Sequence, residues 1–443
     1  MRKRKPEEQK NSGVEWIGKI PMAWRVIKLK FVSIPQTSNV DKKTKDGEID
    51  VELCNYTDVY YNEFITNGIE FMKASATKDQ ISKFRLNVGD VIFTKDSESP
   101  EDIAVPALVK ETKENLICGY HLAQIKPKSQ QVNGGFLFRL FQSDLYSEEF
   151  GNRSNGITRY GLGTYELKNI DVLLPSLPEQ HAIATFLDRK TQAIDQLIEK
   201  KQQLIEKLKE KRQALITRAV TKGLNPDAPM KDSGIEWLGE IPEHWDVLRI
   251  GALFREVDRR NYPNLPLLKV SIHDGVKKKD LSEKKIHQTA SDFNSYKRAN
   301  KGNLAFNKMR AWQGAIGVVP VDGLISPDYT VMEQIKKISN NFYNTIFRTN
   351  NFLVEIDRNS YGIVKDRNRL YWQYFKTIKV PFPKYREQVR INDFISNLSK
   401  KIELSTQKTI EQIEKLKEYR QSLISAAVTG KIDVRDEVEV LAE

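Results

Sequence analysis

Hydrophobic residues recur with a helical period along one unusually long stretch, residues 179–223. The apolar positions lie three, four and seven residues apart, at Ile183, Leu187, Ile194, Ile198, Ile205, Leu208 and Leu215. This spacing places them on one stripe of an α-helix. About 42 helical residues at ~1.5 Å each make a rod of roughly 60 Å, which one small domain cannot cover. The pattern therefore predicts a long helix that needs a partner helix.

A second stretch, residues 387–431, repeats the first one 208 residues later. Its segment EKLKEYRQSLISAAVT (414–429) matches EKLKEKRQALITRAVT (206–221) at 12 of 16 positions. The stripes correspond as well, with Leu187, Ile194, Ile205, Leu208 and Leu215 matched by Ile395, Ile402, Ile413, Leu416 and Leu423. The spacing is typical of a coiled coil, so we expect the two helices to pack on each other, antiparallel because a linker leads the chain back. Two separate amphipathic helices, each lying on its own domain, are the alternative.

A shorter repeat opens each half of the chain. SGVEWIGKIPMAW (12–24) matches SGIEWLGEIPEHW (233–245) at 8 of 13 positions. The halves therefore share both ends and differ in the middle, which indicates a common framework that carries two different binding surfaces. The predicted fold is α+β: two similar α/β domains, separated and joined by two long helices in an antiparallel coiled coil, with an internal pseudo-twofold repeat. The expected segments are a first domain (1–178), a long helix (179–222), a linker (223–232), a second domain (233–386), a second long helix (387–431) and a tail (432–443).

The central part of each half, residues 25–175 and 246–383, contains strand and turn patterns; these two parts are called the middles below. VGDVIFTK (88–95) is a turn leading into a strand, and KGNLAFNKMRAWQGAIGVV (301–319) occupies its place in the second half. Each half then closes with a strand that ends at Pro175 or Pro383. We also expect single strands over 114–128 and 326–335, single helices over 134–150 and 340–356, a frayed N-terminus and a loose tail after Asp433.

Composition and charge narrow the class of protein. The 443 residues are 39% hydrophobic and contain no stretch of 18 apolar residues, so no membrane span is expected. The two cysteines, Cys54 and Cys118, argue against a disulfide framework or a zinc site and fit a reducing cytoplasm. The net charge of +12 favours a polyanionic partner such as nucleic acid. A merely Lys-rich composition is the alternative.

Motifs for catalysis are missing from the sequence. It has no GxxxxGK[ST] phosphate loop, no HExxH, and no Pro-Pro-aromatic element of an amino-methyltransferase. The five histidines are scattered without metal-ligand spacing. Pro327-Asp328 is either the opening of a nuclease carboxylate motif or a turn before a strand. The sequence therefore predicts a protein with no cofactor, metal or reaction of its own.

Candidate DNA contacts gather in the loops of both middles. Arg can bond guanine bidentately, Asn and Gln can bond adenine, and Lys can hold phosphate. The second half offers Asn307, Lys308, Arg310, Trp312 and Gln313, and then Lys365, Arg367, Asn368 and Arg369. The first half offers Lys95, Asn152, Arg153, Asn155, Arg159 and Tyr160. Charged loops that are merely solvated are the alternative, and Trp312 is as consistent with a core residue as with a DNA contact.

Taken together, these blocks resemble the specificity subunits of type I restriction–modification systems over nearly the whole chain. The resemblance rests on two PxxxEQ segments (175–180 and 383–388), each followed by a long helix that ends in RQxLI, at Arg212 and Arg420. It also rests on the SGxEWxGxIPxxW blocks, GDVIFTK and GNLAFNKMRAWQGAIG. Asn303 departs from the family pattern and from Asp90 of the first half, which puts only the local turn in doubt.

The resemblance implies a function and a set of partners. Each domain would read one half of a split, asymmetric target in double-stranded DNA, and the antiparallel coiled coil would set the spacer. Modification (methyltransferase) subunits, expected as two copies, and restriction (translocase and nuclease) subunits would supply the chemistry. The rival hypotheses are a self-sufficient nuclease or methyltransferase with unrecognised motifs, and a coiled-coil scaffold that binds no DNA.

Overall fold

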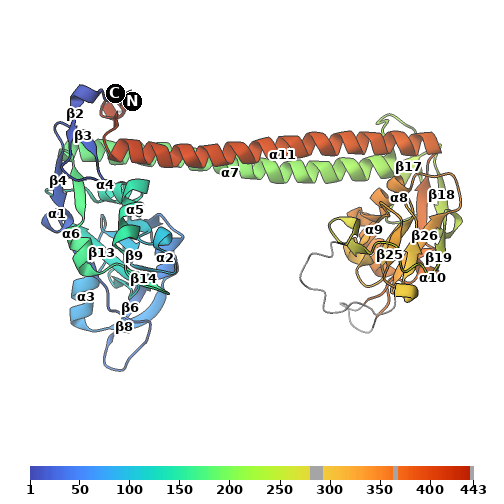
Figure 1. The fold of residues 1–443 in the computed structure, drawn as a ribbon, viewed down its shortest axis with the longest axis horizontal. Helices are drawn as coiled ribbons and strands as arrows, with labels where there is room; N and C mark the ends of the chain where they lie inside the picture. Colours follow the sequence, from blue (N-terminus) through green and yellow to red (C-terminus); the bar gives the residue numbers. More distant parts are fainter. Residues whose placement is uncertain (280–292, 363–367, 440–443) are drawn as a thin grey trace. The chain divides into compact units, whose positions relative to one another are not determined.

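The computed structural model describes residues 1–279, 293–362 and 368–439 of the chain (Figure 1). They form two compact units, the first made of Met1–Lys201 with Glu411–Glu443 and the second of Gln202–Ile410. Each unit combines one α/β domain with one part of each long helix. Each unit contains one copy of the shorter repeat and a part of both long helices.

The main sheet of the first unit has five strands. Their order is β5 (Ser33–Thr37), β13 (Leu122–Pro127), β9 (Val91–Thr94), β11 (Pro106–Val109) and β7 (Phe64–Ile65). The β9 strand is buried on both faces, and α4 (Gly134–Phe141) packs its buried phenylalanines into the same core as Val91 and Phe93. A smaller sheet of β12 (Leu116–Cys118), β6 (Ile49–Cys54) and β8 (Met72–Ala76) lies in a second core of the same unit.

The described residues of the second unit repeat four strands of this sheet. Their order is β19 (Phe254–Val257), β26 (Tyr329–Gln334), β23 (Leu304–Asn307) and β24 (Ile316–Val318), which matches β5, β13, β9 and β11 in turn. The helix α8 (Asn340–Phe347) buries Phe342, Tyr343, Ile346 and Phe347 in the core that also holds β23. The order confirms that the two domains share one architecture.

The shorter repeat forms the framework that joins each domain to the long helices. It supplies the second strand of a hairpin in each unit: β3 (Lys19–Pro21) pairs with β2 (Gln9–Asn11), and β17 (Glu240–Pro242) pairs with β16 (Met230–Asp232), where β2 and β16 directly precede the repeat. Its final tryptophans, Trp24 and Trp245, are fully buried. The chain leaves the long helices at Gly430 and Gly223, both with φ near +70°, against those tryptophans. A side chain at Gly430 would meet Pro21 Cγ at 2.4 Å, so the turn requires glycine.

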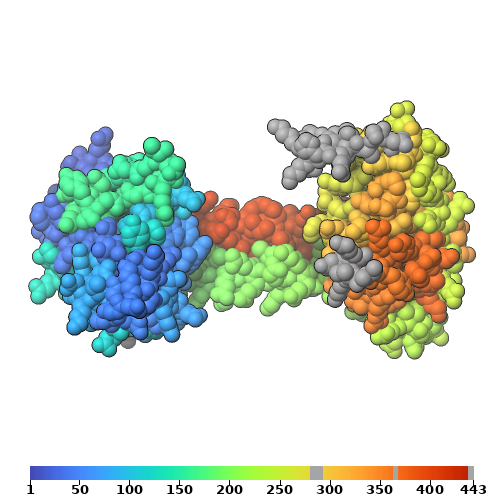
Figure 2. Space-filling model, turned by 90° about the horizontal axis from the view of Figure 1, so that it is seen from below, coloured from blue at the N-terminus to red at the C-terminus, as the bar shows by residue number. Residues whose placement is uncertain are grey.

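The long helices α7 (Leu177–Lys222) and α11 (Tyr385–Val428) lie side by side within each unit (Figure 2). In the first unit Lys201 Nζ donates to Gln412 Oε1 at 2.7 Å, and Arg420 Nε lies 2.9 Å from Asp195 Oδ1. Residue numbers rise along one helix as they fall along the other, so the helices are antiparallel. This confirms the expected pairing, and the alternative of two separate helices is wrong.

The predicted stripes lie on the covered side of the two helices. The buried members are Ile183, Leu187, Ile194, Ile413 and Leu423. The half-buried members are Ile198, Ile205, Leu208, Leu215, Ile395, Ile402 and Leu416. The helices begin two residues earlier than expected, with Pro178 in the first turn of α7, where a missing N–H costs no hydrogen bond. The α11 helix ends at Val428 rather than at 431, because the chain turns at Gly430.

Three single elements predicted from the sequence are wrong, because each is broken in two. Residues 134–150 form α4 and α5 (Asp144–Arg153), with Ser143 extended between them. Residues 340–356 divide in the same way into α8 and α9 (Asn350–Arg358), at Thr349. The hydroxyls of Ser143 and Thr349 donate to carbonyls three residues back, and this local bonding competes with a continuous helix. The expected strand over 114–128 divides into β12 and β13, in different sheets, at Gly119, which approaches Cys54 O too closely for any side chain.

The N-terminal residues and the described part of the tail, as far as residue 439, form regular structure, which corrects the expectations of a frayed N-terminus and of a loose tail over these residues. The strand β1 (Arg2–Lys3) pairs with β28 (Ile432–Asp433), and α12 (Asp436–Glu439) follows. The nearly buried guanidinium of Arg4 lies 2.6 Å from Glu179 and 3.7 Å from Asp433. A buried cation needs such partners, so these two carboxylates hold both terminal segments to the start of α7.

Candidate nucleic-acid interface

A tight turn in each domain starts the strand that leads to the candidate loop. In the first unit Asp90 Oδ2 accepts the Asn87 N–H at 2.9 Å, and in the second unit Asn303 Oδ1 accepts the Asn300 N–H at 2.9 Å. Burial raises the pKa of Asp90, so a neutral amide can replace its carboxyl there. The departure at Asn303 therefore leaves the turn intact.

Two segments of each domain meet at the carboxyl end of that strand. In the first unit the Leu162 N–H donates to Lys95 O at 2.8 Å, and in the second the Leu370 N–H donates to Lys308 O at 2.9 Å. The segments after these strands are thereby joined to the later loops, which are closed by the backbone bridges Asn155–Gly161 and Tyr361–Arg369. The structure thus brings together the two groups of residues that the sequence singled out separately in each half.

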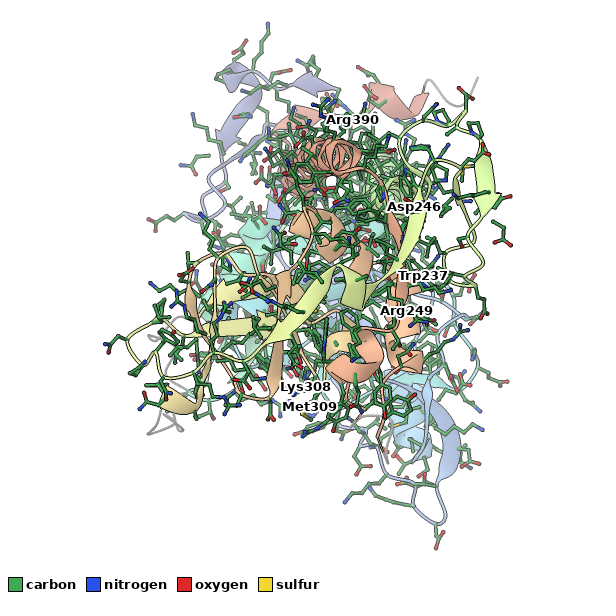
Figure 3. All side chains as sticks on the ribbon, turned by 90° about the vertical axis from the view of Figure 1, so that its right-hand side faces the viewer. Trp237, Asp246, Arg249, Lys308, Met309 and Arg390 are labelled. Carbon is green, nitrogen blue, oxygen red and sulfur yellow. The ribbon has the colours of Figure 1, made fainter. Side chains whose placement is uncertain are left out.

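In the second unit the loop after β23 presents cations. Lys308 is half-buried and Arg310 is exposed. Arg369 approaches the same loop, with Nη2 4.0 Å from Met309 Sδ. Figure 3 shows Lys308 and Met309 together, at the opposite end of this unit from Arg390 on α11. Lys365 and Arg367 lie outside the described residues.

Other predicted residues of this loop shape it instead of projecting from it. Asn307 Oδ1 accepts the Met309 N–H at 3.0 Å, and Trp312 Nε1 donates to Met309 O at 3.1 Å. Trp312 also packs half-buried against the hydrophobic core, which favours the core alternative for this residue. Gln313 is half-buried in the single 3₁₀ turn η5 (Ala311–Gln313).

In the first unit two of the predicted cations are paired with acids. Lys95 Nζ lies 2.8 Å from Asp96 Oδ2, and Arg153 lies 2.6 Å from Glu149 and 3.5 Å from Glu166. Tyr160 is half-buried in the short strand β14 (Tyr160–Gly161), which pairs with β10 (Asp96–Ser97). The exposed residues of the predicted set are Asn152, Asn155 and Arg159. This loop therefore differs in charge from its counterpart in the second unit.

An open groove of about 700 Å³ beside this loop contains residues that the sequence reasoning missed. Tyr60 donates to both oxygens of Asp102, at 3.0 and 2.8 Å, and this bond raises the pKa of Tyr60. Tyr56 stacks on Tyr60 with ring centroids 5.4 Å apart. Tyr61, also in the groove wall, is 77% exposed. The cluster Tyr56-Thr-Asp-Val-Tyr60-Tyr61 was the available signal, since aromatic clusters outside a hydrophobic period often belong to binding surfaces.

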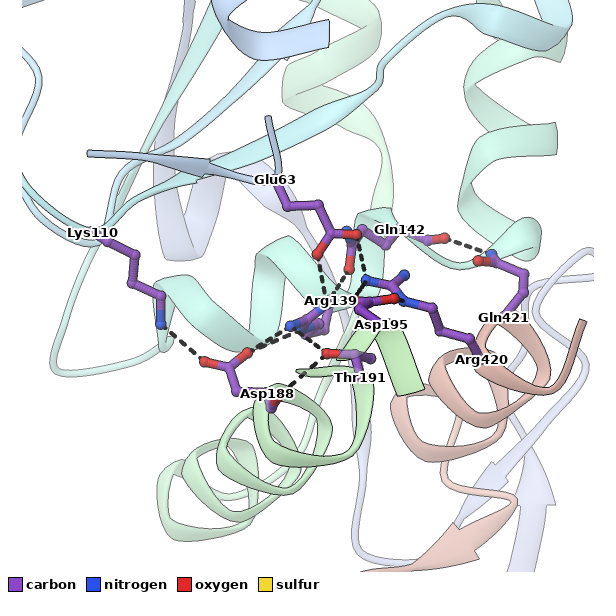
Figure 4. Close-up of polar contacts among 9 residues, drawn as sticks. All are labelled: Glu63, Lys110, Arg139, Gln142, Asp188, Thr191, Asp195, Arg420 and Gln421. Atoms are coloured by element: carbon purple, nitrogen blue, oxygen red, sulfur yellow. Dashed lines mark hydrogen bonds and ion pairs between the residues drawn. The ribbon is translucent and has the colours of Figure 1, made fainter. Parts of the chain in front are cut away.

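A polar network fixes the first domain to both long helices (Figure 4). Arg139 of α4 is 1% exposed and lies 2.8 Å from Asp188 on α7. Arg420 of α11 joins Asp195 of α7 to Glu63 of the domain, the latter at 2.6 Å. Buried and partly buried ion pairs of this kind specify geometry, because either partner left alone is costly. The helices therefore hold this domain in one defined orientation within its unit.

The described ranges contain no group of three or more His, Cys, Asp or Glu side chains placed to hold a metal ion. Asp328 lies in the turn just before β26, as the turn alternative for Pro327-Asp328 expects. Across the same part of the chain, no helix combines the length and the apolar character needed to cross a bilayer.

Comparisons with known proteins agree with this architecture. The family model for the type I restriction modification DNA specificity domain matches twice, at residues 26–207 and 242–415. A putative type I restriction enzyme MjaX specificity subunit from Methanocaldococcus jannaschii is 24% identical, over 95% of this chain and 96% of its own. The MjaVIII specificity subunit of the same organism is 27% identical over 40% of this chain and 41% of its own.

Solved structures show the same fold. A chain from a study of complex assembly and conformational transition of the type I R-M system has a TM-score of 0.65 and 15% identity, covering 93% of this chain and 99% of its own. The HsdS subunit from Thermoanaerobacter tengcongensis has a TM-score of 0.58 and 16% identity, covering 95% of this chain and all of its own.

Proposed function

The chain belongs to the family of type I restriction modification DNA specificity domains, and from this membership we propose that it is the subunit that gives such a system its DNA sequence specificity. Each domain reads one half of a split target. One observation carries the proposal: both domains hold their loops on the same scaffold, through the Lys95 and Lys308 carbonyls, yet fill them with different side chains. Two domains with the same scaffold dock on DNA in the same way, whereas loops with different side chains recognise different sequences. The target is therefore asymmetric.

The candidate contacts divide by role. The exposed residues Arg310, Asn152, Asn155 and Arg159 are proposed to reach bases or phosphates, and Lys308 and Arg369 to hold phosphate near the loop. Asn307, Trp312 and Gln313 are proposed to shape the second loop, and Lys95, Arg153 and Tyr160 to shape the first. Lys365 and Arg367 stay candidates on sequence grounds alone.

The partners are modification subunits, in two copies, and restriction subunits that join through the complex. Matching recesses where the long helices meet the domains support two copies. One, of about 430 Å³, is lined by Asp144, Gln421 and Ser425. The other, of about 680 Å³, is lined by Asn350 with Gln213 and Thr217, which lie 208 residues before Gln421 and Ser425. Similar recesses fit identical partners.

In this proposal all reactions belong to the partner subunits, and the chain itself acts in the cytoplasm as a non-catalytic DNA reader. Purified chain incubated with DNA, Mg²⁺ and S-adenosylmethionine should give neither cleavage nor methylation. A self-sufficient nuclease or methyltransferase would react. A scaffold without DNA binding would give no salt-dependent gel shift, whereas this chain should bind less tightly as salt increases.

The decisive experiment maps methylated adenines in DNA exposed to this chain together with its modification partner. The expected result is a bipartite, asymmetric motif. Replacing residues 246–383 by the middle of another specificity subunit should change one half of the motif and leave the other unchanged. A change in both halves would show that the domains do not read independently.

A further inference from the structure

We propose that Asp102 is a specificity-determining residue of the first domain: its carboxylate accepts a hydrogen bond from the amino group of one base in that domain's half-site, with Tyr60 as its positioning residue. This inference rests on the proposed function and deepens it. It names the group by which the first domain recognises one base. The starting point is the difference between two loops that occupy matched positions in the two domains.

The loops after β9 and β23 occupy matched positions in the two domains. They start at Lys95 and Lys308 and are tied by the same type of backbone bond to Leu162 and Leu370. The second loop continues with Met-Arg-Ala-Trp-Gln, whereas the first continues with Asp-Ser-Glu-Ser-Pro-Glu-Asp (96–102). One loop thus offers hydrogen-bond donors and the other offers acceptors at the same place on the scaffold.

The groove gives these acceptors an aromatic wall. Its sides are α2 (Tyr56–Tyr60), the strand β10 and the 3₁₀ turn η2 (Pro100–Asp102). Exposed Lys42 and Arg159 also line it. Cations beside a groove can bond the phosphates of DNA while the groove floor meets base edges, which offsets the repulsion between carboxylates and phosphates.

Of the two aspartates that line the groove, Asp102 has the geometry of a fixed acceptor. Asp96 is occupied by Lys95 and by His121 Nδ1, both at 2.8 Å. Asp102 meets one hydroxyl, that of Tyr60, and Tyr60 is itself stacked on Tyr56 with an interplanar angle of 17°. One hydroxyl supplies one proton, so most acceptor positions of the carboxylate stay open to a ligand.

A carboxylate in this position distinguishes bases by whether they donate or accept a hydrogen bond. In the major groove adenine and cytosine present an amino group, whereas guanine and thymine present a carbonyl oxygen at the comparable place. A carboxylate only accepts hydrogen bonds, so Asp102 favours adenine or cytosine on the strand that it faces. Asparagine has nearly the same shape but replaces one carboxylate oxygen by an NH₂ group, which donates, so Asp102→Asn can bond either kind of base.

The test uses the chain in complex with its modification partner and maps methylation of genomic DNA. The half-site retained when residues 246–383 are exchanged identifies the sequence read by the first domain. Asp102→Asn should make one position of that half-site, restricted to adenine or cytosine on one strand, accept guanine or thymine with at least about tenfold higher relative methylation than before. The other half-site should not change.

Two further variants keep the test decisive. Tyr60→Phe removes only the hydroxyl that positions Asp102, and it should relax the same position to a smaller extent, which carries the test if Asp102→Asn does not fold. Glu148→Gln removes one exposed carboxylate on α5, outside the groove, and should leave the motif unchanged.

Opposite outcomes separate this inference from the proposed function. If Asp102→Asn strengthens binding to all sequences equally and leaves the motif unaltered, Asp102 acts only through its charge and the inference is wrong. If the unaltered complex methylates DNA without sequence preference, the proposed function is wrong and the inference is lost with it.

Discussion

Arg310 is the exposed cation of the second loop, and its backbone is well held: its carbonyl accepts the N–H groups of Gln313 and Ala315 at 3.1 and 3.0 Å. A guanidinium on a fixed base can bond guanine bidentately. Arg310→Ala should therefore weaken discrimination at one position of the second half-site by ~1–3 kcal/mol. Binding to the target and to singly substituted targets at one salt concentration measures this.

The matched control for Arg310 is Lys336→Ala, which removes an exposed charge from the same domain. It should leave discrimination unchanged. A uniform loss of affinity for every sequence in Arg310→Ala would assign this residue to a phosphate instead.

The ionisation of Asp433 makes the stability of the fold depend on pH in the acid range. Its hydrogen bonds from Arg435 lower the pKa of its carboxyl from 3.8 to about 2. A lowered pKa stabilises the fold above pH 3.8, and this contribution is lost as the pH falls through about 2. We expect a loss on the order of 1 kcal/mol, because Arg435 is 53% exposed and screened by water.

Thermal unfolding from pH 5 to pH 2 tests this linkage. The melting temperature of Asp433→Asn should depend less steeply on pH than that of the unaltered chain between about pH 4 and pH 2. Parallel curves would show that the ion pair contributes nothing.

Residue types could be predicted from the sequence better than their roles. Arg310 and Lys95 both carry a positive charge, but Lys95 is paired with the carboxylate of Asp96. This partner could be seen in the sequence, because Asp96 is the next residue. The Tyr60–Asp102 pair spans 42 residues and depends on how α2 and η2 are placed by the sheets. Side-chain bonds between distant segments leave no periodic signal, so a sequence reading could not find them.

The apolar residues of the α11 stripe are buried to different extents, and the degree of burial determines how far a charged substitution lowers the free energy of unfolding. Leu423 is 4% exposed, whereas Leu416 is only half-buried. Leu423→Asp should destabilise the protein by several kcal/mol, roughly the scale of an uncompensated buried charge, and Leu416→Asp by less, because water reaches part of its carboxylate. Urea denaturation followed by circular dichroism gives both values.

A control for these substitutions lies on the exposed side of the same helix. Lys415→Asp, next to Leu416 but exposed, should change the unfolding free energy by less than about 1 kcal/mol. Equal losses at positions 416 and 423 would contradict the dependence of the loss on burial.

Long elements were easier to predict than short ones. A period sustained over 44 or 46 residues, as in α11 and α7, excludes other structures by itself. The α4–α5 break depends on one extended residue, Ser143, inside an otherwise helical pattern, and serine is common both in helices and at their starts. The strands β12 and β13 divide at Gly119 for a reason that only the neighbouring Cys54 carbonyl explains.

At the scale of the whole chain, the internal repeat was readable because the sequences at both ends of each half recur. Trp24 and Trp245 perform the same packing against Gly430 and Gly223, and all four residues lie in or directly beside the repeated blocks of the sequence. The middles share the strand order, the helix pairs and the backbone bonds that hold the loops, but their loop sequences differ. Their loops differ because each half reads a different sequence in the proposed function, so comparing the halves predicts where binding occurs and not what is bound.

The length of the paired helices is proposed to set the number of base pairs between the half-sites. An insertion that tests this has to avoid Thr191, whose hydroxyl accepts from Arg139 Nη2 at 3.0 Å. It also has to preserve the antiparallel pairing, so four residues are added to each helix, after Lys201 and before Gln412, which face each other. The insertion adds ~6 Å of helix and rotates the part of the helix beyond it by roughly 40° more than one turn.

Each base pair adds about 3.4 Å and 36° along DNA, since one turn of about 34 Å contains ten or so. The double insertion should therefore lengthen the preferred spacer by about one to two base pairs and leave both half-sites unchanged. Methylation mapping on a series of targets with different spacers measures this. An insertion in α7 alone is the control, and it should impair assembly because the pairs on the two sides of the insertion, Asp195–Arg420 and Arg212–Ser399, cannot both stay in register when one helix is longer than the other. If the double variant is fully active on the original spacer, the partner subunits set the spacing and the helices serve only to dock them.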